Sequence, residues 1–280
     1  SSRGYFVGSG EPVVRTAFIG GGVMAEAMLS RGLSERVVAS DAVCVAEPIT
    51  DRRNYLAKTY SVPVSANNTD ALHDADLVVI AVKPQHFAAV AKDMAGVLNK
   101  KQTVLSIIAG LTVSTITKTL DHDSVVRVMP NTPAQIGSGI SVWTATNSVS
   151  DDAREAARTW LGVLGKEWYV ADEHYIDMAT ALSGSGPAYV FAFIESLIEA
   201  GVYLGMPREM AHTLALQTVL GSAELATKTG ENPTLLRERV TSPGGTTAEA
   251  LRALEQRGFR AIILDAVVAA YRKARELGGQ

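Results

Sequence analysis

The segment from Thr241 to Thr247, Thr-Ser-Pro-Gly-Gly-Thr-Thr, has the composition of a ligand-binding loop. Its paired glycines let the backbone approach a ligand or take a positive φ, and Pro243 fixes the entry to the turn. Successive N–H groups and the threonine and serine hydroxyls could surround a carboxylate, so we expect a small acid as the ligand. The alternative is a capping turn, in which Thr246 and Thr247 cap a helix predicted to begin at Ala248.

A glycine-rich turn near the start of the chain is the second group of residues that could do chemistry. A short apolar strand is predicted from Val13 to Ile19, and Gly-Gly-Gly-Val-Met-Ala follows it at residues 20–25. An amphipathic helix is expected next, from Ala25 to Leu33, closing at Gly32. A strand, a glycine turn and a helix in this order form the usual binding site for the pyrophosphate of a dinucleotide.

Each small residue of this GxGxxA pattern has its own role in dinucleotide binding. Gly20 permits the tight turn, Gly22 lets the pyrophosphate approach the backbone, and Ala25 lets the helix pack closely on the strand. A second strand, predicted from Val43 to Ala46, supports the assignment. The alternative is a glycine-rich turn in an α/β domain that binds no nucleotide.

The residues that would choose between the nicotinamide cofactors disagree. Glu47 ends the second strand, where an acidic residue binds the ribose 2′-OH of NAD. Arg52 and Arg53 follow closely, and an arginine that turns back to a 2′-phosphate would favour NADP. Both arginines could equally belong to a solvated helix face.

Two further strand ends carry candidate residues, because ligands of open α/β sheets bind beyond the carboxyl ends of the strands. The strands predicted at 77–82 and 104–108 lead into Lys83-Pro84 and Ala109-Gly110. Lys83 could contact ribose, phosphate or the nicotinamide carboxamide, or be a solvated loop lysine. Continuous Val and Ile runs in these strands, and in those predicted at 125–128 and 140–143, indicate a sheet covered on both faces.

The composition narrows the class of protein. The 280 residues are 47% hydrophobic and 20% charged, which predicts a globular protein of two domains. A net charge of −3 without a basic stripe argues against nucleic-acid and membrane-surface binding. Cys44 is the single cysteine and the five histidines lack ligand spacing, so we expect no metal site and a reducing, cytoplasmic location. No apolar run reaches the length of a membrane span, and residues 1–12 are expected to form a flexible tail.

The second half of the chain is predicted to be almost entirely helical. After a helix at 151–164 and a short strand at 167–170, the helices are expected at 174–182, 187–204, 207–229, 234–240, 248–256 and 260–277. Residues 187–225 are apolar at too many positions for a single surface-facing stripe, so these helices must be buried around their circumference. We therefore predict a homo-oligomer formed through this half, the alternative being a compact monomeric bundle packed on the first domain.

Four stretches together resemble the pyrroline-5-carboxylate reductases, the enzymes that make proline. They are Phe-Ile-Gly-Gly-Gly at 18–22, Ala-Val-Lys-Pro at 81–84, Leu-Ser-Gly-Ser-Gly-Pro-Ala-Tyr at 182–189 and the loop at 241–247; Arg-Val-Met-Pro-Asn-Thr-Pro at 127–133 is a fifth agreement. The first motif is generic, whereas 182–189 and 241–247 are specific, and the resemblance runs from about residue 14 to residue 275. It implies an α/β protein with an N-terminal Rossmann-type dinucleotide-binding domain, residues 13–171, followed by an all-α C-terminal dimerisation domain, residues 172–280.

The resemblance also implies an activity, the reduction of L-1-pyrroline-5-carboxylate to L-proline by NAD(P)H. It further implies a homo-oligomer of dimer units, with a decamer as a higher assembly. It implies a substrate segment in which backbone N–H groups grip the carboxylate and the Thr247 hydroxyl, the expected catalytic group, lies near the ring nitrogen. This segment comprises Ser242, Gly244, Gly245, Thr246 and Thr247. The expected cofactor residues are Gly20, Gly22, Val23, Met24, Glu47, Arg52, Asn68, Val82, Lys83, Pro84, Ala109 and Gly110.

Cofactor preference is the point at which the chain departs from the family pattern. Many NADPH-using relatives have a small hydroxyl residue in place of Glu47, but the resemblance as a whole still favours NADPH over NADH. Two other functions stay open. One is another two-domain nicotinamide oxidoreductase of the β-hydroxyacid type, which would need a lysine in the helical half, where Lys228 is the only lysine between Glu167 and Gln256. The other is a non-catalytic nucleotide sensor that uses the helical half only for association.

Overall fold

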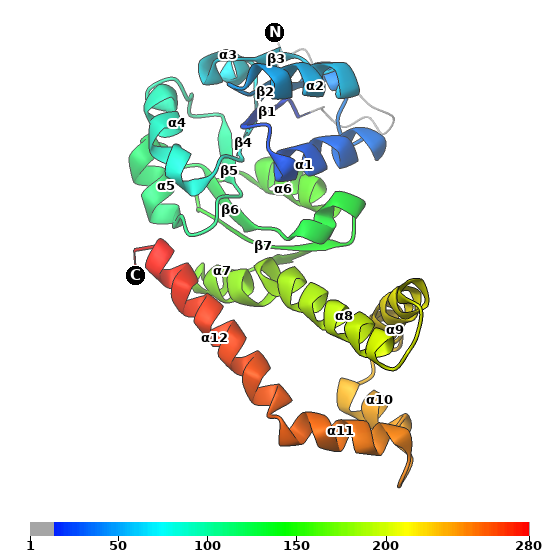
Figure 1. The fold of residues 1–280 in the computed structure, drawn as a ribbon. Coiled ribbons are helices and arrows are strands. Elements are labelled where there is room, and N and C mark those ends of the chain that lie inside the picture. The colour runs from blue at the N-terminus through cyan, green and yellow to red at the C-terminus, as the bar shows by residue number, and fades with distance from the viewer. Residues whose placement is uncertain (1–13, 280) are drawn as a thin grey trace. The chain divides into compact units, whose positions relative to one another are not determined.

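A mostly parallel, eight-stranded sheet is the centre of the first part of the chain (Figure 1). The computed structural model describes residues 14–279, so the tail expected at residues 1–12 lies outside the described residues. The strand order is β3-β2-β1-β4-β5-β6-β7-β8, and neighbours pair in parallel except β6 with β7. The order reverses beside β1, which is the topological switch point of a doubly wound sheet. The strands are β1 (Thr16–Ile19), β2 (Val43–Ala46), β3 (Val64–Ser65), β4 (Leu77–Ile80), β5 (Thr103–Ser106), β6 (Val125–Met129), β7 (Gly139–Ala145) and β8 (Gly165–Tyr169).

Helices cover both faces of the sheet, as the continuous apolar runs predicted. Along β1, Phe18 belongs to one buried apolar cluster while Ala17 and Ile19 belong to the other, because successive side chains point to opposite faces. The first cluster contains residues of α1 (Val23–Ser34), α2 (Thr50–Tyr60) and α6 (Asp151–Gly162). The second contains residues of α3 (Asn68–Leu72), α4 (Phe87–Met94) and α5 (Val113–Leu120). The short helices η1 (Ser40–Ala42), η2 (Pro84–His86) and η3 (Thr132–Ile136) lie in the connections.

Gly32 lies inside α1, whereas the sequence predicted that the helix closes there. The helix continues to Ser34, and the Glu35 N–H donates to the carbonyl of Arg31. A Cβ at Gly32 would lie 2.3 Å from the Trp160 ring of α6. That ring also packs edge-on against Phe18 and donates its N–H to the Thr16 hydroxyl. The glycine is therefore required by the close approach of α1 and α6.

Helices make up the rest of the chain. They are α7 (His174–Ala179), η4 (Thr180–Gly184), α8 (Gly186–Tyr203), α9 (Arg208–Thr229), α10 (Pro233–Arg239), α11 (Thr246–Gln256) and α12 (Phe259–Leu277). The segment η4 is a π-helix, in which the Ser185 N–H donates to the Thr180 carbonyl at 2.8 Å. The sequence predicted a break at this point, but the chain passes through the π-helical turn into α8, with Pro187 in its first turn.

The contacts within the chain divide it into two compact units. The first contains the sheet, α7, η4 and the end of the chain from Ala270, and the second is Gly186–Ala269. The predicted domains, 13–171 and 172–280, were assigned by expected function, whereas these units are defined by contacts. The domain boundaries therefore stay a prediction.

The second unit has almost no interior of its own. Within residues 186–269, all of which the structure describes, the buried residues are Ala211 and Ala215 of α9. Large apolar side chains on α8, α9 and α12 are exposed instead, and Leu204 is 76% exposed. The helical stretch His174–Tyr203 is even long and apolar enough to cross a membrane by length and composition alone. This degree of exposure is typical of helices that pack against another chain.

We predict that Gly32→Ala lowers the stability of the protein. Alanine is the better helix former by about 1 kcal/mol, but its methyl group would overlap the Trp160 ring, and such overpacking costs about 1–3 kcal/mol. The urea midpoint of unfolding should therefore fall. Gly162→Ala is the matched control, because Gly162 also lies in a helix and its added Cβ would meet open space. A Gly32→Ala midpoint at or above that of the unaltered protein would contradict the proposed contact.

Candidate active site

The turn between β1 and α1 leaves no room for a side chain at Gly20 or Gly21. Gly20 has a φ of +94°, and a Cβ there would lie 2.8 Å from the Val82 side chain. Gly22 is the N-cap of α1 and makes no side-chain capping bond. The first N–H groups of α1 therefore have no partner within the helix, which is the arrangement that binds a phosphate. The roles predicted for Gly20 and Gly22 stay predictions that this geometry supports.

Gly21, for which the sequence predicted no role, is held on both sides. Its N–H donates to Glu47 Oε2 at 2.9 Å, and its carbonyl accepts from Arg52 Nε at 2.6 Å. A Cβ at this position would lie 2.5 Å from the Leu56 side chain. In the sequence, the only sign of a role for Gly21 is that it is a glycine between the two glycines of the GxGxxA pattern. Charged side chains thus fix the conformation of the expected phosphate-binding turn.

Arg52 is held in turn by a carboxylate that the sequence analysis missed. Its guanidinium pairs with Glu26 of α1 and lies over the Tyr55 ring. Burial tends to raise the pKa of Glu26, but hydrogen bonds from Tyr60, Arg52 and Tyr55 outweigh it and lower that pKa. Burial and the bond to Glu26 raise the pKa of Tyr60. At neutral pH Glu26 is therefore an anion that holds Arg52 on the glycine turn.

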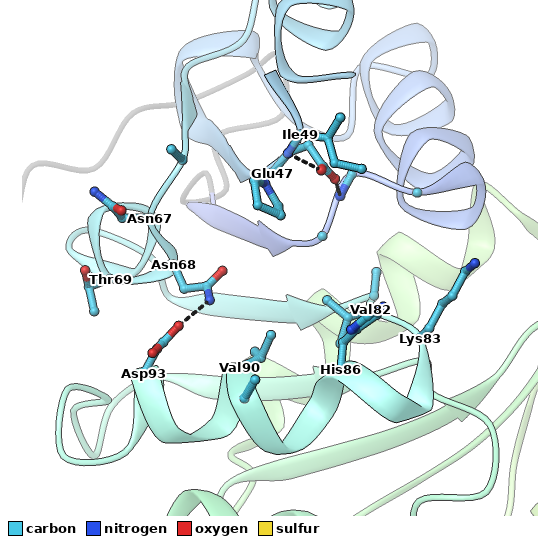
Figure 2. Close-up of a pocket in the computed structure, with 17 residues that line it drawn as sticks. Glu47, Ile49, Asn67, Asn68, Thr69, Val82, Lys83, His86, Val90 and Asp93 are labelled. Carbon is cyan, nitrogen blue, oxygen red and sulfur yellow. Dashed lines mark hydrogen bonds between the residues drawn. The ribbon is translucent and has the colours of Figure 1, made fainter. Parts of the chain in front are cut away.

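A pocket of about 850 Å³ opens beside the glycine turn (Figure 2). It lies at the carboxyl ends of β1, β2 and β4 and is walled on one side by α4. Its size is in the range of cofactor sites. It brings together six of the predicted cofactor residues: Gly20, Gly22, Glu47, Asn68, Val82 and Lys83. The residues of its lining that were not predicted as cofactor residues are Gly21, Pro48, Ile49, Ala66, Asn67, Thr69, Ala81, His86, Ala89, Val90 and Asp93.

Glu47 is fixed in the wall of this pocket. Its side chain is buried, with Oε2 accepting from Gly21 and Oε1 accepting from the Ile49 N–H at 2.9 Å. Asn68 and Asp93 lie at another part of the lining, where the Asn68 amide donates to the Asp93 carboxylate at 3.1 Å (Figure 2). Asn68 is the first residue of the short helix α3.

The other predicted cofactor residues lie outside the pocket lining. Val23 and Met24 begin α1 and Pro84 begins η2, while Ala109 and Gly110 follow β5. Arg52 was expected to turn toward a 2′-phosphate, but its guanidinium is bound to Glu26 and to the glycine turn instead. Arg53 donates to the carbonyls of Glu47 and Pro48. Neither arginine side chain is directed into the pocket by these contacts.

The loop at 241–247 leads directly into α11. Gly244 has a φ of +68°, and the Gly245 N–H donates to the Ser242 carbonyl at 3.0 Å. Helix α11 begins at Thr246 with Gly245 as its N-cap, and no side chain caps it. The alternative in which Thr246 and Thr247 cap the helix is therefore wrong, because both residues already lie in its first turn. The first N–H groups of α11 have no carbonyl partner within the helix, and an acidic group would be stabilised there.

Comparisons with known proteins agree with the two halves of this description. Residues 173–277 match the family "Pyrroline-5-carboxylate reductase dimerisation", and residues 15–110 match "NADP oxidoreductase coenzyme F420-dependent". The pyrroline-5-carboxylate reductase of Synechocystis is 44% identical to this chain. The match covers 95% of this chain and 98% of the Synechocystis protein.

Solved structures of the same family are also similar throughout. The pyrroline-5-carboxylate reductase of Coxiella burnetii superimposes with a TM-score of 0.88 at 35% identity, over 95% of this chain and 98% of the other. The Plasmodium falciparum pyrroline carboxylate reductase, solved with NADP bound, gives a TM-score of 0.86 at 30% identity, again over 95% and 98% of the two chains. The expected α/β fold, with a Rossmann-type first part and an all-α dimerisation part, is confirmed, and the chain belongs to the pyrroline-5-carboxylate reductase family.

Proposed function

We propose that the chain reduces L-1-pyrroline-5-carboxylate to L-proline with a nicotinamide cofactor, the last step of proline biosynthesis. The observation that carries the proposal is that a chain matching a family member over 98% of that member combines a pocket at its glycine turn with a polar loop that leads into a helix N-terminus. A reducing cytoplasm, expected from the lone Cys44, is the proposed location.

The loop at 241–247 is the proposed binding site for the substrate carboxylate. Pyrroline-5-carboxylate carries one carboxylate and one C=N bond on a five-membered ring. The first N–H groups of α11, beginning at Thr246, supply donors, and the helix terminus adds a partial positive charge. The positive φ of Gly244 turns the chain back toward this terminus. Ser242, Gly244, Gly245, Thr246 and Thr247 remain the proposed substrate segment.

Thr247 is the proposed donor to the ring nitrogen. A bound nicotinamide would supply hydride to the imine carbon, and the nitrogen gains electron density and takes up a proton as that C–H bond forms. The Thr247 side chain lies in the first turn of α11, and a hydroxyl can donate one hydrogen bond, directly or through a water. A strong acid is not needed, since one hydrogen bond stabilises the developing lone pair and binding supplies the alignment.

The β-hydroxyacid alternative is not supported by the position of its required lysine. Lys228 lies near the end of α9, is exposed and pairs with Glu224 on the same helix. The sensor alternative predicts tight cofactor binding without turnover. An assay of NAD(P)H oxidation with pyrroline-5-carboxylate, with a β-hydroxyacid and oxidised cofactor in parallel, distinguishes the three functions.

We predict that Thr247→Ala lowers kcat/KM for pyrroline-5-carboxylate by about tenfold or more, which corresponds to about 1.4 kcal/mol of transition-state stabilisation. The loss follows from removing the hydroxyl that donates to the ring nitrogen. Thr247→Ser, which keeps the hydroxyl, should recover most of the activity, and α11 should remain folded in both variants by circular dichroism. A Thr247→Ala value within about twofold of the unaltered enzyme, less than half a kcal/mol, would show that this hydroxyl has no such role.

For the cofactor, we propose NADH rather than the NADPH that the family resemblance favoured. Glu47 places a buried carboxylate in the pocket wall, and the backbone N–H groups of Gly21 and Ile49 prevent it from turning away. A carboxylate accepts a hydrogen bond from a ribose 2′-OH but repels a 2′-phosphate. The two arginines that could offset this repulsion are bound elsewhere.

We predict that Glu47→Gln shifts the ratio of kcat/KM with NADH to kcat/KM with NADPH toward NADPH by about tenfold, or about 1.4 kcal/mol. Both values should fall somewhat, because glutamine has one acceptor oxygen for the two N–H groups. The ratio isolates the effect on the 2′-position. Glu35→Gln is the control, since Glu35 forms an exposed ion pair with Arg31 and should leave the ratio unchanged. If the unaltered enzyme prefers NADPH and Glu47→Gln leaves the ratio as it is, the proposal is wrong.

The second half supports a homo-oligomer, and we propose a dimer as its unit, with a decamer as the possible higher assembly. The family match over 173–277 is to a dimerisation domain, and residues 186–269 expose large apolar side chains. Burying such side chains against a second chain would be worth about 1.5–3 kcal/mol for each one that becomes fully covered.

We predict that light scattering at micromolar concentration gives at least twice the 29.6 kDa of one chain. Leu220→Glu on α9 or Leu264→Glu on α12 should lower the mass toward one chain, because each places a charge on an exposed apolar face. Lys118→Glu on α5, an exposed residue of the first unit, is the control and should leave the mass unchanged. A monodisperse monomer of the unaltered protein would overturn the proposal.

A further inference from the structure

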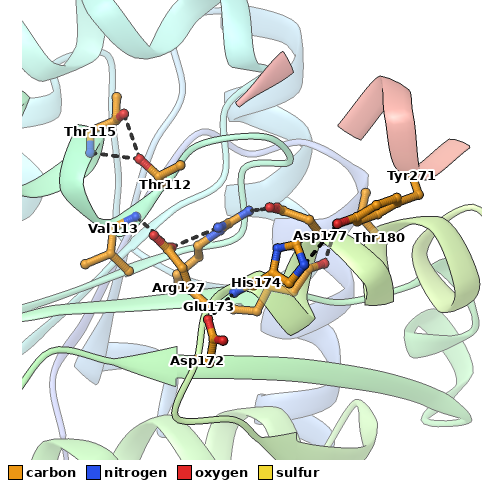
Figure 3. Close-up of polar contacts among 11 residues, drawn as sticks. Thr112, Val113, Thr115, Arg127, Asp172, Glu173, His174, Asp177, Thr180 and Tyr271 are labelled. Carbon is orange, nitrogen blue, oxygen red and sulfur yellow. Dashed lines mark hydrogen bonds and ion pairs between the residues drawn. The ribbon is translucent and has the colours of Figure 1, made fainter. Parts of the chain in front are cut away.

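Arg127 of β6 is a buried positive charge with two acidic partners (Figure 3). Its side chain is only 2% exposed, and its Nη2 pairs with Asp177 of α7 at 2.7 Å. Its Nη1 pairs with Glu173, the N-cap residue of α7, at 2.8 Å. The sequence analysis noted Arg127 only as part of a family motif. The fold brings it together with residues that are distant in the sequence.

The same Glu173 oxygen that binds Arg127 also holds the beginning of α5. Oε2 of Glu173 accepts the Val113 N–H at 2.9 Å, and Val113 is the first residue of α5. The Thr112 hydroxyl caps that helix by accepting from the Thr115 N–H at 3.1 Å. The loop between β5 and α5, residues 107–112, therefore ends at a point fixed by the ion pair between buried Arg127 and partly exposed Glu173. This loop contains Ala109 and Gly110, two of the expected cofactor residues.

The end of α12 contacts the same loop and the same acidic segment. A Cβ at Gly110 would lie 3.0 Å from the Leu277 side chain, and Gly110 has a φ of +81°. His174, next to Glu173, hydrogen-bonds the Tyr271 hydroxyl at 3.0 Å (Figure 3). The β5–α5 loop is thus held at Gly110 by packing and at Val113 by a charge-assisted hydrogen bond.

We propose that Arg127 and Glu173 are positioning residues that hold the β5–α5 loop where it receives the nicotinamide ring. This inference rests on the proposed function, because it needs a nicotinamide cofactor whose adenosine half occupies the pocket beside Glu47. The loop follows β5, at the carboxyl edge of the sheet and two strands from β1, where the reactive half of a dinucleotide is expected. Arg127 acts through Glu173 on Val113 and does not touch the cofactor.

The ion pair between Arg127 and Glu173 is better suited to fixing the position of the loop than to raising the free energy of unfolding. A buried ion pair adds little stability compared with well-packed apolar side chains of similar size. Charge-assisted hydrogen bonds, in contrast, are short and directional and fix geometry. Hydride transfer is sensitive to small misplacement of the reacting atoms, so a loop displaced by a lost anchor should slow it strongly.

The test compares two ligands that share the adenosine half. NADH or NADPH, whichever the unaltered enzyme prefers, and ADP-ribose are titrated calorimetrically into the unaltered protein, Glu173→Ala and Glu173→Gln, and kcat with pyrroline-5-carboxylate is measured alongside. Glu173→Ala should weaken binding of the nicotinamide cofactor about fivefold and lower kcat about tenfold, while ADP-ribose affinity stays within about twofold. Glu173→Gln keeps an acceptor for Val113 and should stay within about threefold of the unaltered kcat. Glu155→Ala, which removes an exposed ion pair with Arg158, is the control.

The outcomes distinguish a positioning role of Glu173 from a merely structural one. They also show whether a failure concerns this role or the proposed function. Equal weakening of both ligands, or no effect on either, would overturn it. If Glu173→Ala does not fold, Tyr271→Phe provides the same comparison, since it removes the hydrogen bond to His174 and should lower kcat about threefold with ADP-ribose binding kept. If the unaltered protein binds both ligands but does not reduce pyrroline-5-carboxylate, the proposed function fails, while the comparison of cofactor with ADP-ribose still tests the role of Glu173.

Discussion

The turn after β1 has space for backbone alone at Gly20 and Gly21, and the arrangement of the first unit depends on that constraint. A side chain at Gly20 would collide with Val82 at the end of β4, and one at Gly21 would collide with Leu56 of α2. Because β1 lies in the middle of the sheet and its carboxyl end opens on the pocket, the glycines let neighbouring elements close on the turn while leaving N–H groups exposed. Gly32 meets the same kind of constraint at the other end of α1, where Trp160 approaches.

Three carboxylates of the first unit have different structural roles, which follow from the groups that each one binds. Glu47 accepts backbone N–H groups and still lines the pocket, so it both fixes the turn and places a carboxylate in the pocket wall. Glu26 is not part of the lining of the pocket beside the glycine turn, and its lowered pKa keeps it charged to hold Arg52. Glu173 is the anchor of a different loop. An acidic residue near a glycine turn of this kind is therefore not evidence of ligand contact by itself, because all three carboxylates bind backbone N–H groups or arginines and only Glu47 also lines the pocket.

The sequence predicted well the elements whose side chains are buried along their whole length. Prediction was less accurate for short elements, which contain too few residues to show a periodic pattern. The strands at 77–80 and 103–106 are buried along their whole length, and their predicted positions agree closely with the structure. The short elements β3 and α3 have little apolar periodicity, so neither was predicted from the sequence. Thr246 was placed as a possible cap because threonine is a common capping residue, but a glycine performs that role. The Arg127–Glu173–Asp177 cluster required the fold itself, since only sheet pairing and the packing of α7 bring those residues together.

In the helical half, small residues form the contacts between helices and large apolar residues are exposed. Its apolar periodicity therefore did not show which helix faces are buried within the chain. Helices α8 and α9 approach through small residues, and a Cβ at Gly201 would lie 2.9 Å from the Ala211 methyl group. The large apolar side chains, such as Phe191 and Leu220, remain exposed on the same two helices. Burial of large side chains supplies most of the hydrophobic free energy, so contacts within residues 186–269 use little of it. The rest becomes available when a second chain covers these faces. Folding of this unit and association of chains are then expected to be coupled, with a stability that depends on protein concentration.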